Sequence, residues 1–408
     1  MRTLLRLIAP VAALLVVALP GFAQVTFNAT ALTVPSGDPV TVTGATTVSG
    51  QTVFLGIYAP NGGADPTARV FTSANGTPSN PNLGSLGGDA VLSVFGNSAG
   101  QFAGHAQTAT TFHAYFSNGG TMVDLGTLSG NAAQSSYATG INAGGIVVGG
   151  SVASSATTHA FRLDTTVGTS LATNGVDLGT LGGLGFFSTA NAVNASGTIV
   201  GSSHYTNANT NSHAFRLDSG TLTANGVDLG TLGGTTSSAH AITNSGGIAG
   251  VSDIAGDAHT HVFYLSSGTL SAANDIGTLN GATGNVTFGG MNNSGHIVGS
   301  SAFDGTFDPN DASTSRAYYF NGSQMLDLTS LTSGLSNGIV LHDALAISDA
   351  GDILAFGYNA DFSAGGYFVL SASAIPEPST YAALAGAVAL GVVLVRRRRH
   401  ALANACQR

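Results

Sequence analysis

A stretch of about 50 residues recurs along the chain, and this repeat constrains the fold more than any other feature. It is clearest at 177–227, where DLGTLGG is followed by ANAVNASGTIVGSS and then by SHAFRLDSG. The same three segments, which we call words, begin again at Asp228. The first two units are degenerate. Each unit has one glycine at the expected turn in its second segment, and these glycines align the seven units: Gly50, Gly100, Gly145, Gly197, Gly246, Gly295 and Gly351. Because such units bury a shared core against their neighbours, the sequence predicts a repeat protein.

The words of each unit are typical of short strands separated by turn residues. The segment 193–201 (VNASGTIVG) reads as a strand end, a turn with glycine at the position that needs a positive φ, and a second strand. His213, Phe215 and Leu217 would share one face of an extended strand, which predicts a half-buried strand. No helical pattern is found between the two termini, so we expect an all-β body over residues 24–373.

Four strand words in each of seven units match a blade of a β-propeller in size and strand number. We therefore predict a β-propeller-like fold of about seven four-stranded units, with an open β-repeat stack or solenoid as the alternative. The last unit ends at 366–370 with no DLGTL word after it, while the strand-like segment 25–34 precedes the first hairpin. The N-terminal segment is expected to complete the last blade.

Both ends of the chain look like targeting segments. Residues 1–23 carry two arginines, an apolar run and small residues before Gln24, which predicts a signal peptide removed by signal peptidase. At the other end, Pro376, Glu377 and Pro378 precede an apolar run at 381–395. That run is predicted to be a transmembrane helix. An arginine block closes it: Arg396, Arg397, Arg398 and Arg399. The positive charge predicts that the tail 400–408 is cytoplasmic.

The order of these C-terminal elements, over residues 374–399, resembles the PEP-CTERM sorting signal of Gram-negative bacteria, which is also labelled an ice-binding-protein C-terminal domain. The resemblance implies recognition and cleavage by an exosortase-type transpeptidase. It also implies association with exopolysaccharide and biofilm matrix. We therefore expect an exported protein that is transiently anchored in the inner membrane and then reaches the outer surface or extracellular matrix of a Gram-negative bacterium.

Charge and cysteine content narrow the possible partners. Only 8% of residues are charged, and the sole cysteine is Cys406, so no disulfide can form within the chain. Between the two targeting segments the chain has no lysine and only four arginines, Arg69, Arg162, Arg216 and Arg316, against 19 aspartates. An acidic body of this kind excludes nucleic acid as an expected partner.

The three recurring words together resemble the bacterial extracellular HAF repeat, over residues 82–370. The best copies of the tripeptide are 159–161 and 213–215. The family is described by export and repetition, so the resemblance implies no catalytic mechanism.

A histidine and an aspartate recur once per unit: His113, His159, His213 and His261, with Asp124, Asp177, Asp228 and Asp275. We predict that they are structural, each histidine being a buried residue satisfied by a hydrogen bond. Arg69 and Arg316 occupy the same position in other units, which argues against a metal, and no cofactor is expected. The start of one antiparallel strand does not oppose the start of the next, so any His–Asp contact is expected to join different blades or turns.

The sequence has no P-loop or H-E-x-x-H motif, and its only glutamate is Glu377. We therefore predict that the protein is not an enzyme. A cell-surface or matrix-associated repeat protein is the first functional hypothesis. The alternative is a glycan- or ligand-binding module that uses aromatic loops such as 185–187 (GFF) and 204–207 (HYTN).

Overall fold

The computed structural model describes residues 25–32, 40–58, 67–72, 78–79, 83–154, 157–183, 186–205, 211–281, 283–303, 314–336, 338–361 and 363–373. The predicted signal peptide, sorting segment and tail lie outside these residues. Two units are distinguished: the body, Phe27–Ala372, and the two ends of the chain, Met1–Thr26 with Ser373–Arg408. Within the described residues, no helix combines the length and the apolar character that spanning a membrane requires.

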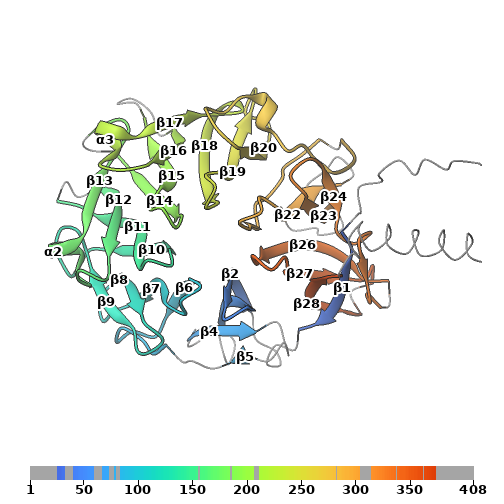
Figure 1. The fold of residues 1–408 in the computed structure, drawn as a ribbon, viewed down its shortest axis with the longest axis horizontal. Helices are drawn as coiled ribbons and strands as arrows, with labels where there is room; N and C mark the ends of the chain where they lie inside the picture. Colours follow the sequence, from blue (N-terminus) through green and yellow to red (C-terminus); the bar gives the residue numbers. More distant parts are fainter. Residues whose placement is uncertain are drawn as a thin grey trace, which may run out of the picture. The chain divides into compact units, whose positions relative to one another are not determined.

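The body is a ring of seven antiparallel sheets, or blades, that follow one another along the chain (Figure 1). Blades 1 and 2 are β2 (Val40–Val48), β3 (Gln51–Tyr58), β4 (Thr67–Thr72) and β5 (Pro78–Ser79), then β6 (Val91–Gly96), β7 (Phe102–Gln107), β8 (Phe112–Ser117) and β9 (Val123–Gly126). Blades 3 and 4 are β10 (Ser136–Ile141), β11 (Ile146–Val152), β12 (Thr158–Asp164) and β13 (Val176–Gly179), then β14 (Ser188–Val193), β15 (Ile199–His204), β16 (Ser212–Leu217) and β17 (Val227–Gly230).

The remaining blades vary in strand number. Blade 5 has three strands, β18 (Gly233–Ile242), β19 (Ile248–Ile254) and β20 (Thr260–Leu265). Blade 6 has β21 (Gly290–Met291), β22 (Ile297–Ala302), β23 (Ser315–Phe320) and β24 (Met325–Asp327). Blade 7 is built from β26 (Val340–Ile347), β27 (Ile353–Tyr358), β28 (Gly365–Ala372), β1 (Phe27–Ala31) and β25 (Thr332–Ser333). The predicted all-β propeller is confirmed, and the open stack is not adopted.

The ring is closed by the N-terminal strand, as predicted. β1 pairs antiparallel with β28, with Ala29 opposite Leu370 and Thr30 opposite Val369. β25 adds to the outer side of β1 in parallel. The first and last strands of the body therefore lie in one sheet, which removes the free edge that an unclosed last blade would expose.

Short helices interrupt the blades, which the sequence pattern did not predict. α2 (Leu171–Asn174) and α3 (Leu222–Asn225) lie between the third and fourth strands of their blades, and η1 (Ala272–Asn274) and η2 (Leu279–Gly281) are single 3-10 turns. Leu171 and Leu222 are buried in the core clusters on either side of blade 3. A helix of one turn carries too little periodicity to be detected.

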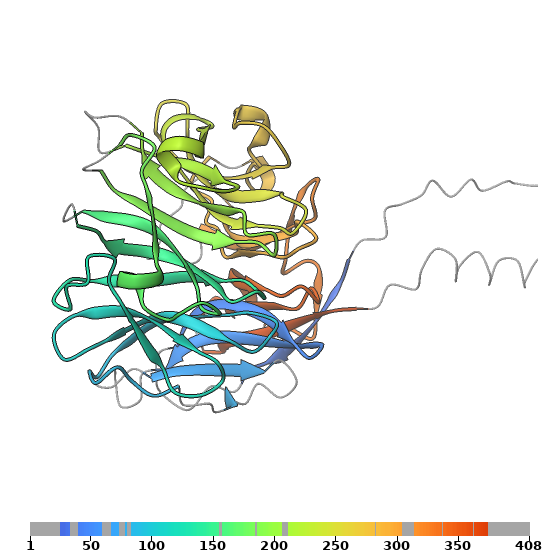
Figure 2. The ribbon, with the colours of Figure 1, turned by 60° about the vertical axis from the view of Figure 1, so that its left-hand side comes forward.

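The core lies between neighbouring blades, which pack face to face around the ring (Figure 2). The aromatic residue of each HAF-like word is fully buried there: Tyr115, Phe161, Phe215, Phe263 and Tyr318. Each ring lies opposite a glycine of the second strand, such as Gly201 opposite Phe215. A Cβ at Gly201 would lie 1.9 Å from the carbonyl oxygen of Thr189 and 2.9 Å from the Phe215 ring. This glycine is therefore required by close packing.

Asparagine side chains in the hairpin between the first and second strands join one blade to the next. The seven aligned glycines that follow these turns all have positive φ, between 76° and 95°. In blade 4, Asn194 Oδ1 accepts the backbone N–H of Ser196 (3.1 Å) and Thr198 (3.0 Å), while its Nδ2 donates to the carbonyl of Thr243 in blade 5 (3.1 Å). Asn97 and Asn142 make the same two kinds of bond, to the carbonyls of Asn142 and Asn194.

We predict that replacing Asn194 with alanine lowers the free energy of unfolding by about 2 to 3 kcal/mol, because one buried side chain makes both the turn and the inter-blade bonds. Asn194→Ser should cost less, about 1 kcal/mol. Serine can cap the turn as Thr243 does in blade 5, where Thr243 Oγ1 accepts the N–H of Gly247. Urea unfolding of both variants measures the difference. Wild-type stability of Asn194→Ala would contradict a structural role for this amide.

Candidate functional site

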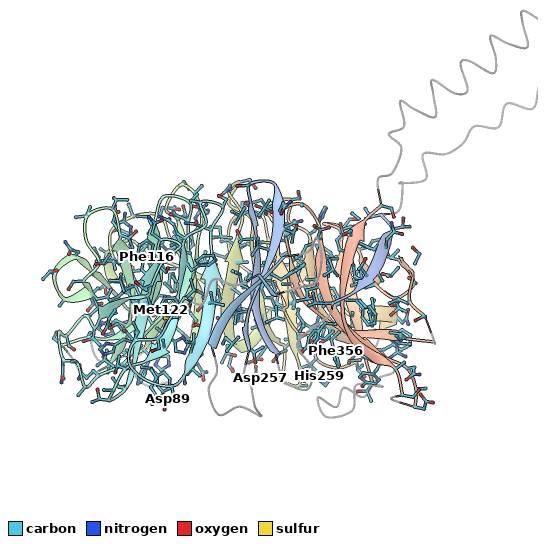
Figure 3. All side chains as sticks on the ribbon, turned by 90° about the horizontal axis from the view of Figure 1, so that it is seen from below. Asp89, Phe116, Met122, Asp257, His259 and Phe356 are labelled. Carbon is cyan, nitrogen blue, oxygen red and sulfur yellow. The ribbon has the colours of Figure 1, made fainter. Side chains whose placement is uncertain are left out.

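The ring has two faces with different contents. The hairpins between first and second strands lie on one, which we call the turn face. The connections between second and third strands, and between blades, lie on the other, which we call the loop face. In the edge-on view, the connection residues Asp89, Asp257 and His259 lie along one rim, with Phe116, near the end of a third strand, toward the other (Figure 3).

The recurring histidines and aspartates pair with each other near the loop face. His113 Nδ1 lies 2.9 Å from Asp124, and His159 Nδ1 lies 2.9 Å from Asp177. His213 and Asp228 are 2.9 Å apart, and His261 and Asp275 are 2.7 Å apart. Within the described residues, no group of three or more His, Cys, Asp or Glu side chains is arranged to hold a metal ion.

The prediction that such contacts would join different blades was wrong, because every pair lies within one blade. Three pairs join the third and fourth strands, and His261 of β20 pairs with Asp275, which follows η1 and forms an isolated bridge with Phe263. The fourth strand is short, and a register shift places Asp177 opposite Phe161, two residues from His159. Gly179, with a φ of 67°, allows this bulge. The Asp177 carboxylate also accepts the N–H of Gly179 at 2.8 Å. The bulge thus aims the carboxylate diagonally at the imidazole of the neighbouring strand.

The second ring nitrogen of two of these histidines ties the blade to the following connection. His113 Nε2 lies 3.1 Å from the carbonyl oxygen of Gln134, and His261 Nε2 lies 3.2 Å from that of Gly284. Both carbonyls precede the first strand of the next blade. These two side chains therefore connect the third strand of the blade with its paired aspartate and with the connection out of the blade.

The aspartates of blades 3 and 4 have lowered pKa values. Burial alone would raise the pKa of the Asp177 carboxyl, but hydrogen bonds from His159 and from the N–H of Gly179 outweigh it and hold the pKa below the ordinary 3.8. The pKa of Asp228 is lowered in the same way by His213 and Gly230. The folded protein thus favours the charged carboxylates over the protonated acids.

We predict that these two carboxylates contribute to acid destabilisation. A lowered folded pKa means that the unfolded chain binds protons more readily, so their contribution is complete above pH of about 4 and is lost as the pH falls through the folded pKa. Urea unfolding at about pH 5 and about pH 3 should show a smaller loss for the double variant Asp177→Asn, Asp228→Asn than for the wild type. The exposed Asp89→Asn serves as control. An unchanged pH dependence in the double variant would contradict the assignment.

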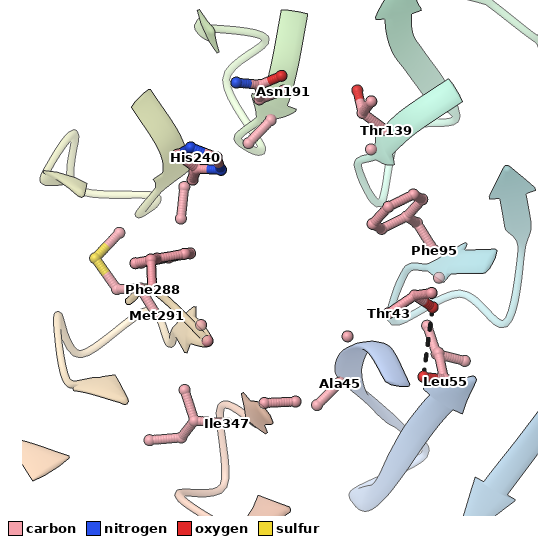
Figure 4. A pocket seen from close by; sticks show the side chains of 18 of the residues that line it. Thr43, Ala45, Leu55, Phe95, Thr139, Asn191, His240, Phe288, Met291 and Ile347 are labelled. Atoms are coloured by element: carbon pink, nitrogen blue, oxygen red, sulfur yellow. Dashed lines mark hydrogen bonds between the residues drawn. The ribbon is translucent and has the colours of Figure 1, made fainter. Parts of the chain in front are cut away.

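A cavity of about 420 Å³ lies on the ring axis and is lined by the first-strand segments of all seven blades (Figure 4). Phe95 lies on one side of it and Phe288 on the other, beside His240 at a ring distance of 5.6 Å. The His240 side chain is open to the cavity but enclosed by the blades, and this burial lowers its pKa. Thr139 and Asn191 donate to the backbone carbonyls of the next blade, Ala190 (2.5 Å) and Ala239 (2.8 Å).

Blade 4 carries a cluster of aromatic side chains on the loop face. Phe187 is 52% exposed, and its ring lies 5.5 Å from that of His204, to which Phe186 is also close at 6.5 Å. Tyr205 stacks on the imidazole of His213 at 3.6 Å. Next to Phe187 a hollow of about 120 Å³ is lined by hydroxyl groups, including those of Ser202 and Ser212. We call these five rings the aromatic cluster.

Comparison with known protein families identifies one segment. Residues 374–399 match the PEP-CTERM protein-sorting motif. The predicted sorting signal is therefore confirmed, and it indicates an exported protein that passes through a membrane. The match does not extend to the repeats, so the HAF assignment and the ice-binding label stay predictions.

No curated protein matches the chain. Among solved structures, it is similar to the β-propeller domain of the Trilobed protease from Pyrococcus furiosus, with a TM-score of 0.46 and 8% identity over 81% of this chain and 93% of that chain. It is also similar to the acylaminoacyl peptidase of Pyrococcus horikoshii (TM-score 0.47, 7% identity, 85% of this chain and 54% of that chain). A third similar structure is fructan 1-exohydrolase IIa from Cichorium intybus (TM-score 0.32, 10% identity, 86% of this chain and 94% of that chain).

These similarities correct one prediction. The sequence led us to expect that the protein is not an enzyme, and this is contradicted by neighbours that are peptidases and glycoside hydrolases. The error lay in the reasoning from motifs, because a propeller can assemble a site from loops that are far apart in the sequence. The similarities assign no reaction to this chain, whose fold is defined by its own sheet topology. Fold and sorting motif together define an exported β-propeller protein.

Proposed function

We propose that this exported propeller is released to the outer surface or extracellular matrix of a Gram-negative bacterium, where the aromatic cluster of blade 4 binds a glycan. The observation that carries the proposal is the exposure of Phe187 beside Phe186, His204 and Tyr205 on one blade. An exposed aromatic ring beside partly exposed ones is the feature that separates a binding module from a purely structural matrix protein. Exopolysaccharide is the proposed partner.

The chemistry of the cluster suits a sugar ring. Aromatic faces stack against the C–H face of a pyranose, while hydroxyl and imidazole groups bond to its hydroxyls. Here the exposed Phe187 ring supplies the apolar face, and Ser202, His204 and Ser212 line the hollow beside it.

The sorting motif supports the proposed route. We propose that signal peptidase removes residues 1–23 and that an exosortase-type transpeptidase acts at the motif after a transient stay in the inner membrane. Pro376, Glu377, Pro378 and the arginine block Arg396–Arg399 would be the recognised groups.

We predict that Phe187→Ala reduces glycan binding about tenfold, the loss expected for one stacking aromatic side chain. A glycan array followed by titration of the best ligand measures this. Val167→Ala is a matched control, because Val167 is a 72% exposed apolar residue in the hairpin between the third and fourth strands of blade 3. Equal effects of the two substitutions, or an array without any hit, would contradict the proposal.

We also predict that most molecules in the surface fraction of the native host end near Pro378, since the motif is expected to be cleaved. Mass spectrometry of the C-terminal peptide decides this. Replacing Arg396 to Arg399 with alanine should trap the uncleaved chain in the membrane fraction. Chains that end mainly at Arg408 in the wild type would instead indicate a permanent membrane anchor.

A further inference from the structure

One crevice on the turn face differs from its equivalents around the ring. In blades 2 to 6, the residue after the buried aromatic of the HAF-like word faces the next blade. An aromatic side chain occupies this position in blades 2, 5 and 6, as Phe116, Tyr264 and Tyr319. Phe116 is buried in the core shared with blade 3, and Tyr319 packs edge-on against Phe27 of blade 7 at 5.4 Å. These rings fill their crevices.

Blade 3 has Arg162 at this position, and its crevice is open. A cavity of about 380 Å³ lies between blades 3 and 4, which is within the range of small-molecule sites. Its floor is apolar, formed by Leu178, Ile199 and Leu217. Its rim is polar, with Arg162 on one side and Asp218 on the other.

The guanidinium of Arg162 makes no hydrogen bond or salt bridge among the described residues, and Asp164 interacts with it only through its charge. The equivalent arginine of blade 4, Arg216, donates to Asp218 at 2.9 Å. In blade 3 the corresponding carboxylate, Asp164, instead accepts the hydroxyl (2.6 Å) and the N–H (3.0 Å) of Thr166. Arg162 thus presents a fork of donors to the cavity, and a planar carboxylate is the group that fits it.

The opposite rim offers a hydrogen-bond acceptor to a ligand hydroxyl. Asp218 accepts Arg216 and the hydroxyl of Thr198 at Oδ1, and no described group bonds to Oδ2. Hydroxyl side chains of Ser196 and Ser219 lie at the same rim. A ligand with a carboxylate at one end, hydroxyls at the other and a C–H face between them would contact Arg162, the Asp218 rim and the apolar floor together.

We propose that the crevice between blades 3 and 4 binds a hexuronate residue of an acidic polysaccharide, with its carboxylate on Arg162, its hydroxyls toward Asp218 and its ring over Leu178 and Leu217. The site is on the face opposite the aromatic cluster and does not depend on the proposed glycan site there. The crevice would let a body with a net negative charge bind an acidic polysaccharide through one arginine.

The test is calorimetric titration of the full-length protein with trigalacturonate, the neutral trisaccharide galactotriose and a triaspartate peptide. We expect trigalacturonate to bind, with an affinity that falls as salt rises, and the other two to bind at least about tenfold more weakly. Equal binding of triaspartate would show that the carboxylate alone is recognised. Equal binding of galactotriose in a Phe187→Ala background, where the aromatic cluster is disabled, would exclude a role for the charge. Either result, or no binding of trigalacturonate, overturns the proposal.

Two variants assign the site. Arg162→Phe places in blade 3 the residue that blade 2 has as Phe116, so it should fold stably, fill the crevice and reduce trigalacturonate binding at least about tenfold. Arg162→Lys keeps the charge but loses the fork, and an intermediate loss is expected. Leu92→Ala, at a 45% exposed residue of blade 2 that does not line the crevice, should leave trigalacturonate binding unchanged. Wild-type affinity in Arg162→Phe would overturn the assignment.

Discussion

The ring depends on one kind of interaction, the side-chain amide of the turn asparagine. A primary amide has an acceptor and a donor on the same planar group, so Asn142 and Asn194 can fix their own turn and hold the next blade at once. Neighbouring blades also meet through apolar packing, which is not directional, and through other hydrogen bonds such as those of Thr139 and Asn191. The amides therefore set the spacing of the blades that the core then fills. Blade 5 departs from this pattern: Thr243 has no amide, and the backbone N–H of Asn244 bonds to Asn293 instead.

Much of this was predictable from the sequence because a similar hairpin recurs in all seven units. Repetition of its turn glycine, which ends an N-x-x-G sequence in four units, and of the I-V-G strand indicated the unit size, and the absence of a fourth strand segment after Leu370 placed β1 in blade 7. The His–Asp pairing was predicted with the wrong geometry, because a one-residue bulge at Leu178 and Gly179 changes which residues are opposite. Register shifts of this kind have no signature in a hydrophobic pattern.

The candidate sites were harder to foresee, because they lie where the repeats differ. The loops of blade 4 were singled out for their aromatic residues, and the structure brings Tyr205 onto His213 and Phe187 beside His204. The Arg162 crevice was missed. Its signal was present in the alignment of the HAF-like words, where arginine replaces an aromatic residue in two units. Only the structure shows that Arg216 forms a salt bridge with an aspartate of its own blade and that Arg162 does not.

Closure of the ring by β1 and β28 has a consequence for export. β1 is the first strand of the body to be made, and β28, its partner, is the last, ending at Ala372 only two residues before the matched sorting motif begins. Blade 7 therefore stays incomplete until the exported chain extends to β28. A body that lacks β28 leaves the edge of β1 unpaired, and such an edge can pair with another chain. The matched sorting motif thus begins directly after the strand that completes the ring.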